Sequence, residues 1–302
     1  MARYGVPYKG SKNSVARWVV GVLPPSHTLV DLFAGGCAVT HAAMLSGKWG
    51  RFIVNDTNDV PQVFADAIDG KFADYATVPT REEFDAAKGD DTVLSLLYSF
   101  GNDRRSYLWL RDVEQVKYHA SRMLLAGGAR ERYAEYHKFV RALGAYVEAN
   151  GTDCLRMDHL RRGNGVTECV NLQRLQRLHG LENLQRLQGL HGLQRVCVSV
   201  SRLDYRDVDV PDGATAYADP PYRNTSQEQY RQGAFDHVGF DSWLAEVPFP
   251  VFVSECTCPD GCVEVSRTQR RRHTAGNGND GVVTERLFVQ ERFAEMAMLG
   301  GT

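Results

Sequence analysis

Short apolar runs separated by turn residues predict an α/β region at the start of the chain, from Tyr4 to about Asp69. The pattern indicates a helix over residues 14–23 that ends at Pro24, and then a strand over 29–33, a helix over 39–46 and a strand over 52–55. A strand, a glycine turn, a helix and a second strand are typical of a nucleotide-type βαβ unit.

The same α/β pattern of short apolar runs and turn residues returns after residue 195. Apolar runs predict strands over 196–201, 215–218 and 251–254, and a closing hairpin near 275–281 leads into a strand over 285–290. In residues 196–201, valine alternates with Cys or Ser. This alternation predicts a strand whose valine side chains face outward and whose Cys and Ser side chains face the interior.

Residues 72–195 have a mainly helical pattern, rich in Arg and Tyr. The simplest organisation is one Rossmann-like α/β sheet domain, formed by residues 1–71 and 196–302, that is interrupted by a helical insertion over 72–195.

Leucine recurs at every third position from Leu172 to Leu193. An α-helix advances 100° per residue, so eight such leucines drift around its whole circumference. A winding of three residues per turn, or short stacked turns, would keep them on one side. We interpret the repeat as a packing or spacer element rather than as a DNA-contacting surface; its conformation stays open at this stage.

Composition is that of a globular chain, with 43% hydrophobic and 24% charged residues among 302. Because the net charge is −2, binding of a polyanion would have to depend on local basic patches. Seven cysteines at irregular spacings, no apolar leader and no membrane-length segment favour a cytoplasmic protein with reduced thiols. The cluster Cys256, Cys258 and Cys262 is interpreted as strand-end cysteines rather than as a zinc site, so we expect no metal.

The sharpest chemical signal is Asp219-Pro220-Pro221-Tyr222, directly after the strand over 215–218. Methylation of an aromatic amine is difficult because the nitrogen lone pair is delocalised into the ring. The Asp219 carboxylate and the Pro220 carbonyl are suited to accept the two amine hydrogens, and paired prolines make the loop rigid. Tyr222 offers a flat face on which an extruded base can stack. The alternative is a plain strand-to-turn link.

A second signal is the glycine turn that follows the strand over 29–33, in Phe33-Ala34-Gly35-Gly36. Such a turn lets a ligand approach the backbone and the following helix N-terminus. Asp56, at the end of the next strand, lies where a carboxylate usually holds a ribose diol. The turn is not a G-x-G-x-x-G loop, which disfavours a dinucleotide enzyme.

A third signal, the basic segment Pro7-Tyr8-Lys9-Gly10-Ser11-Lys12, completes an order of motifs. That order, with Asp-Leu-Phe-Ala-Gly-Gly, a long insertion and Asp-Pro-Pro-Tyr, resembles the Dam-like DNA adenine methylases of bacteria and phages. The resemblance spans nearly the whole chain through about twenty specific residues. Two departures are Gly10-Ser11 before the lysine and the leucine repeat.

The resemblance implies a Rossmann-like methyltransferase that uses S-adenosylmethionine, with the insertion as target-recognition domain. It implies cofactor contacts from a set of residues spread over the sheet domain: Tyr8, Lys12, Phe33, Ala34, Gly35, Asp56 and Asp219. Protection of DNA from restriction is the biological role that such a resemblance suggests.

Basic side chains near two predicted loops are the candidates for contacting double-stranded DNA. Asn102 is suited to read a base edge, and arginines to contact phosphates: Arg104, Arg105, Arg270, Arg271 and Arg272. The sequence therefore predicts direct methyl transfer to the N6 amine of a flipped adenine. Alternatives are transfer to cytosine N4 or to RNA, and a catalytically silent DNA-binding or assembly protein. Oligomeric state and recognition sequence stay open.

Overall fold

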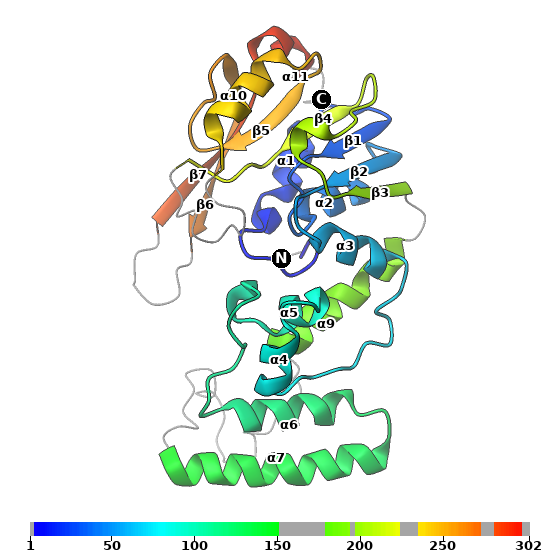
Figure 1. Ribbon diagram of the computed structural model, residues 1–302, viewed down its shortest axis with the longest axis vertical. Helices are drawn as coiled ribbons and strands as arrows, with labels where there is room; N and C mark the ends of the chain where they lie inside the picture. The colour runs from blue at the N-terminus through cyan, green and yellow to red at the C-terminus, as the bar shows by residue number, and fades with distance from the viewer. Residues whose placement is uncertain (1–2, 151–178, 194–196, 224–234, 273–280, 298–302) are drawn as a thin grey trace. The chain divides into compact units, whose positions relative to one another are not determined.

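The computed structural model describes residues 3–150, 179–193, 197–223, 235–272 and 281–297 (Figure 1). The chain divides into two units: one holds residues 1–6, 10–69 and 190–302, and the other holds 7–9 and 70–189. The assignment of 72–195 as a target-recognition domain stays a prediction.

The first unit is built on a seven-stranded sheet with the order β3-β2-β1-β4-β5-β7-β6. The strands β3, β2, β1, β4 and β5 run parallel, and β7 is antiparallel to both β5 and β6. Their bounds are β1 (Thr28–Asp31), β2 (Arg51–Asn55), β3 (Cys197–Ser201), β4 (Thr215–Ala218), β5 (Val251–Glu255), β6 (Cys262–Arg272) and β7 (Gly281–Gln290). This mixed sheet with its helices confirms the predicted Rossmann-like α/β class.

The helices of the first unit are η1 (Lys12–Ser14), α1 (Ala16–Val22), α2 (Ala38–Ser46), α3 (Val60–Ile68), η6 (Tyr205–Asp207), α10 (His237–Glu246), η8 (Glu291–Phe293) and α11 (Ala294–Ala297). The crossovers β1-α2-β2 and β4-α10-β5 run in opposite directions from the centre of the sheet. Because parallel crossovers are right-handed, α2 and α10 cover opposite faces (Figure 1). Phe240 and Leu244 of α10 pack on Val30, Ala216 and Val253.

The predicted strands are confirmed, including the one over 285–290, which lies in β7. The strand before the closing hairpin, β6, was not predicted, and the turn at 273–280 lies outside the described residues. One orientation was wrong. In the edge strand β3, Cys197 and Ser199 are exposed, whereas Val198 and Val200 are half-buried. The valines face inward because burial of an aliphatic side chain is more favourable than burial of a thiol or a hydroxyl.

The described part of the second unit is helical, as its pattern predicted: α4 (Arg81–Ala87), α5 (Thr92–Tyr98), η2 (Phe100–Asn102), α6 (Glu114–Leu125), α7 (Ala129–Asn150) and α9 (His179–Gln188), with η5 (Gly189–Leu193) after it. Its core contains an aromatic group formed by Phe84, Tyr98, Tyr107 and Trp109. Tyr98 and Tyr107 donate their hydroxyls to the carbonyls of Thr77 and Pro79.

The end of the leucine repeat combines two windings. Leu181, Leu184 and Leu187 lie on the α-helix α9, and Leu190 follows in the 3-10 helix η5; all four are buried. Three leucines spread over only about 120° of an α-helix, and the tighter turn then limits further drift. This part packs as a core element; Leu172, Leu175 and Leu178 lie outside the described residues.

Candidate active site

The glycine turn follows β1, which lies between β2 and β4 in the sheet. This is a topological switch point, because the chain leaves β1 toward β2 on one side while β4 pairs on the other. Gly35 and Cys37 both have positive φ, 47° and 56°, and the Cys37 amide donates to the Ala34 carbonyl at 2.6 Å. The turn is therefore tight, and it begins α2 next to the ends of the central strands.

Asp56 follows β2 and is held against the glycine turn. Its Oδ2 accepts the Gly35 amide at 2.8 Å, and its Oδ1 accepts the Asn58 amide at 3.1 Å. Burial raises the pKa of Asp56, and the backbone donors at Gly35, Asn58 and Thr57 partly oppose that rise. The sequence-predicted partners Gly35 and Asp56 are thus in direct contact.

The Asp219–Tyr222 loop follows β4, so its carboxylate lies at the same edge of the sheet as the glycine turn. Pro220 is buried, and the side chain of Asp219 is 17% exposed. Burial raises the pKa of Asp219, and the nearby Lys12 lowers it.

Lys12 connects the N-terminal segment to this loop. Its Nζ lies 2.6 Å from Asp219 Oδ1 and 4.4 Å from the centroid of the Tyr222 ring. Lys12, Asp219 and Tyr222, predicted from distant motifs, therefore form one cluster. Tyr8 is half-buried and belongs to the segment 7–9 of the second unit, so its cofactor contact stays a prediction.

Three acidic side chains anchor the loop, and the sequence reasoning did not name them. Glu285 of β7 accepts the Tyr222 hydroxyl at 2.8 Å, and Glu255 of β5 accepts the Arg223 amide at 3.0 Å. The Arg223 guanidinium pairs with Asp241 of α10. The sequence contains a signal that could have indicated them. Glu255 and Glu285 are carboxylates in apolar strands, where a buried charge is costly unless it is paired.

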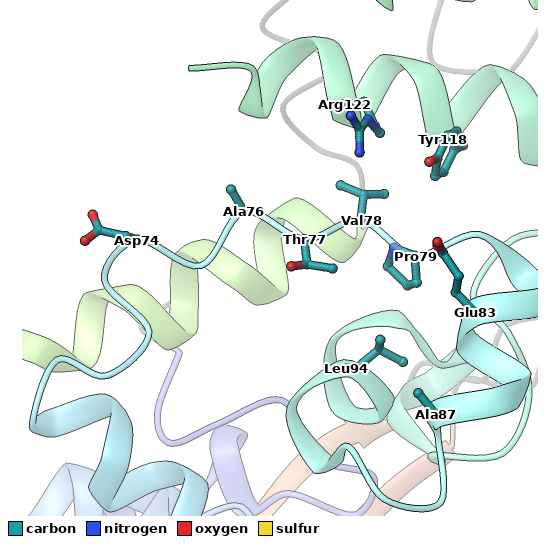
Figure 2. Close-up of a pocket in the computed structure, with 10 residues that line it drawn as sticks. All are labelled: Asp74, Ala76, Thr77, Val78, Pro79, Glu83, Ala87, Leu94, Tyr118 and Arg122. Carbon is teal, nitrogen blue, oxygen red and sulfur yellow. The ribbon is translucent and has the colours of Figure 1, made fainter. Parts of the chain in front are cut away.

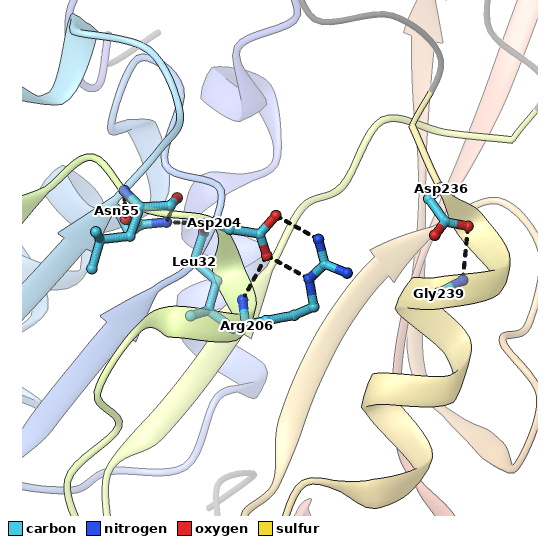
Figure 3. A network of polar contacts seen from close by, with 7 residues as sticks. Leu32, Asn55, Asp204, Arg206, Asp236 and Gly239 are labelled. Atoms are coloured by element: carbon cyan, nitrogen blue, oxygen red, sulfur yellow. Dashed lines mark hydrogen bonds and ion pairs between the residues drawn. The ribbon is translucent and has the colours of Figure 1, made fainter.

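Asn55, at the end of β2, joins three strand ends (Figure 3). Its amide nitrogen donates to the carbonyls of Leu32 and Leu203, both at 3.1 Å. Its oxygen accepts the Ser201 hydroxyl and the Leu203 amide. This buried amide holds the segments after β1 and β3 together. The sequence did not predict this role, because a single asparagine at the end of a strand belongs to no motif.

Two further carboxylates shape the loops beyond Asn55 (Figure 3). Asp204 caps η6 through the Arg206 amide and also pairs with the Arg206 guanidinium, and Asp236 caps α10 through the Gly239 amide. Between these loops, the half-buried Phe33 packs against Tyr205 and Phe235, with ring centroids 5.2 and 5.7 Å away. An aromatic surface therefore adjoins the glycine turn.

Asp31 and Cys37 lie beneath the turn and are buried. Thr40 donates to Asp31 Oδ2 at 2.6 Å, and burial raises the pKa of Asp31 to about 7, with further rises from Asp219 and Asp56. Burial also raises the pKa of the Cys37 thiol well above its ordinary value, so this thiol stays protonated. Cys37 has the small buried role expected of it.

Three of the DNA-contact candidates, Asn102, Arg104 and Arg105, belong to the second unit. Asn102 Nδ2 donates to the Leu96 carbonyl, and the Arg104 guanidinium donates to Ser95 and Thr92. These two side chains hold their own loop, in which Asn102 and Arg104 have positive φ. Arg105 is exposed. The backbone of Arg270, Arg271 and Arg272 lies in β6, and the structure describes only the backbone of these three residues. Their DNA contacts stay predictions.

A cavity of about 520 Å³ lies within the second unit (Figure 2). Its lining includes Glu83 of α4 and Tyr118 and Arg122 of α6, and it contains none of the predicted site residues. In the described ranges, no group of three or more His, Cys, Asp or Glu side chains is arranged to hold a metal ion. Within that same part of the chain, no helix is both long and apolar enough to cross a membrane.

Comparison with protein families gives one match, to the D12 class N6 adenine-specific DNA methyltransferases, over residues 8–120. The match covers less than half of the 302 residues and includes Lys12, the glycine turn and Asp56. None of the curated proteins matches the chain.

Proposed function

We propose that this chain transfers the methyl group of S-adenosylmethionine directly to an adenine flipped out of double-stranded DNA. The match of residues 8–120 to the D12 class N6 adenine-specific DNA methyltransferases, the Dam-like family, supports this reaction. The observation that carries the proposal is the position of Asp219. Its carboxylate follows β4 at the switch point, next to the glycine turn, and is paired with Lys12.

The residues around the turn fit the cofactor by their chemistry. Phe33 offers an aromatic face for an adenine ring, and Asp56 offers a carboxylate for a ribose diol. Lys12, Ala34, Gly35 and Asp219 complete the surface, and Tyr8 is the remaining candidate. When bound, S-adenosylmethionine supplies an electrophilic methyl group on a positively charged sulfur. Asp219 and the partly protonated Asp31 supply negative charge near such a cation.

Asp219 and Pro220 are the acceptors for the target amine. In its ionised form the Asp219 carboxylate accepts one N–H, and the Pro220 carbonyl accepts the other, which localises the nitrogen lone pair. Tyr222 supplies the stacking face that holds the extruded base. The amine nitrogen gains the methyl group as the methyl–sulfur bond breaks, which leaves S-adenosylhomocysteine, and it then loses one proton to solvent. This direct transfer needs no protein nucleophile. The buried, protonated Cys37 thiol agrees with this direct route.

The experiment that tests the function is methylation of duplex DNA with S-adenosylmethionine, followed by digestion to nucleosides and chromatography. We expect N6-methyl-2′-deoxyadenosine from the wild-type protein. N4-methylcytosine instead, or modification of RNA alone, would show that the target amine is wrong.

Asp219→Asn tests the catalytic assignment. We expect methyl transfer to be lost while the protein keeps its circular dichroism spectrum and still binds S-adenosylmethionine in calorimetry. Glu264→Gln is the matched control, because Glu264 pairs with Arg267 of its own strand β6 and with Arg286 of the neighbouring β7. Full activity in Asp219→Asn, or no cofactor binding by the wild type, would overturn the proposal.

The contact with DNA is proposed to use Asn102, Arg104, Arg105 and Arg270–Arg272, and the biological role is proposed to be protection of DNA from restriction. Each phosphate contact releases counterions, so the logarithm of the affinity should fall with the logarithm of salt concentration by about 0.9 per contact. A flat dependence on salt would count against these contacts.

A further inference from the structure

The Tyr222 ring is held at two places by residues from two other elements. Its hydroxyl donates to Glu285 Oε2 at 2.8 Å, and the Lys12 ammonium lies 4.4 Å from the ring centroid. Glu285 belongs to β7 and is 2% exposed. A third residue, Asp219, adjoins both, because its Oδ1 is 2.6 Å from Lys12 Nζ.

The two contacts restrain different torsions of the tyrosine. The hydroxyl oxygen lies on the axis of the Cβ–Cγ bond, so a hydrogen bond to it restrains χ1 but leaves rotation about χ2 free. The ammonium over the ring face restrains χ2, because a cation is attracted to the face and not to the edge. Together, Glu285 and Lys12 therefore set both the place and the plane of the ring.

A buried carboxylate at position 285 is not explained by packing of the sheet. Its neighbours on β7, Leu287 and Phe288, are apolar and buried, and a charge among them is costly unless it is hydrogen-bonded. Its negative charge also raises the pKa of Asp219, which works against the ionised form that accepts the amine. Glu285 thus disfavours the ionised form of the nearby acceptor, and its hydrogen bond with the Tyr222 hydroxyl is a function that an apolar residue could not supply.

We propose that Glu285 is a positioning residue for adenine N6 methylation: it fixes the Tyr222 hydroxyl and so pre-orients the ring on which the flipped base stacks. This inference rests on the proposed function. A ring already in place restricts the base to orientations in which its amine meets Asp219 and Pro220. Loss of the Glu285–Tyr222 hydrogen bond lowers the fraction of bound base that is correctly placed. It does not change the reactivity of a base that is correctly placed.

The test uses the full chain and two duplexes. The first is a duplex that the wild-type protein methylates, and it gives kcat. The second is the same duplex with 2-aminopurine in place of the target adenine; it has no N6 amine to methylate and reports the position of the base by its fluorescence. Extrusion of 2-aminopurine from the duplex raises its fluorescence, and stacking on an aromatic ring lowers it again. The variants are Glu285→Ala, Glu285→Gln, Tyr222→Phe, Tyr222→Ala and the double variant Tyr222→Phe with Glu285→Ala. Glu264→Gln, on the adjacent strand, is the control for loss of a carboxylate.

We expect Glu285→Ala to lower kcat by about tenfold to a hundredfold, the scale of a small misplacement of reacting groups. The bound 2-aminopurine should be brighter than in the wild type, because it stacks less well. Glu285→Gln, whose amide oxygen still accepts a hydrogen bond, should recover most of both values. Tyr222→Phe should match Glu285→Ala, and the double variant should lose nothing more.

Two results separate the failure of this inference from the failure of the proposed function. A normal kcat in Tyr222→Phe, or unchanged 2-aminopurine fluorescence in Glu285→Ala with a lowered melting temperature, would show that Glu285 only supports the fold. Absence of any fluorescence difference between Tyr222→Ala and the wild type would instead remove the stacking role of Tyr222 itself. If Glu285→Ala does not fold, Tyr222→Phe decides, because it removes only the hydroxyl that donates to Glu285.

Discussion

Lys12 Nζ lies 2.6 Å from Asp219 Oδ1, which joins a segment near the start of the chain to the loop after β4. The pair is mostly buried, with 13% and 17% of the two side chains exposed. The ammonium therefore counteracts the rise that burial causes in the pKa of Asp219. In the proposed mechanism this contact favours the ionised form of the acceptor.

Lys12→Met should move the acid limb of the activity profile to higher pH. Without the ammonium, the pKa of Asp219 rises further, so the carboxylate is protonated over a wider range and accepts the amine less well. The measurement is kcat across the pH range at saturating cofactor and DNA. Lys9→Met, at an exposed neighbouring position, is the control. An unchanged limb would show that Lys12 does not control the ionisation of Asp219.

Asp31→Asn should stabilise the protein above pH 7 and have less effect in acid. The folded-state pKa of Asp31 is raised to about 7 from 3.8, so between these values the folded form holds a proton that the unfolded form has lost. The free energy of unfolding therefore falls as pH rises through this window. Asparagine carries no charge and still accepts the Thr40 hydroxyl, so we expect a gain of about 1 to 3 kcal/mol in alkaline solution.

Urea denaturation at about pH 5 and about pH 8 measures this effect. Asp66→Asn is the control, since Asp66 pairs on the surface with Gln62. Equal changes at both pH values would contradict the raised pKa of Asp31.

Asn55→Ala should destabilise the first unit by about 2 to 4 kcal/mol, because it leaves several backbone groups at the strand ends without their partner. The carbonyls of Leu32 and Leu203 each accept from this side chain. Cofactor affinity should fall as well, since the glycine turn follows Leu32 directly. Urea denaturation and calorimetry measure the two effects. Gln62→Ala, on the exposed face of α3, should leave both unchanged.

Gly180→Ala should destabilise the second unit, although alanine favours a helix over glycine by about 1 kcal/mol. A Cβ at this position of α9 would lie 2.7 Å from Cε1 of the buried Tyr98 ring. Overpacking of a well-packed core costs about 1 to 3 kcal/mol, which exceeds the gain in propensity. Gly144→Ala in α7 has open space around it and should stabilise instead. A higher melting temperature in Gly180→Ala would mean that α9 and α5 do not pack this closely.

The sequence alone determined every strand except β6 and the position of the glycine turn, and it singled out Asp56 and Asp219 as candidate site residues. These features depend on neighbouring residues: apolar runs form strands, Gly35 permits positive φ, and paired prolines stiffen the loop after β4. The order of the motifs was enough to predict an adenine methyltransferase, which the family match over residues 8–120 supports.

Only the tertiary structure decided which residues, distant in the sequence, contact the side chains of these motifs. Strand order places β4 beside β1 and brings Lys12 to Asp219, while β7, which pairs antiparallel with β5, carries Glu285 to the Tyr222 hydroxyl. Asn55 and Glu285 have no local pattern, because their roles come from backbone and side-chain partners far away along the chain. Likewise, the inward valines of β3 and the α-helical winding at Leu181–Leu187 are set by what covers them. Local sequence specifies conformation, and burial against distant elements selects among the arrangements that it leaves open.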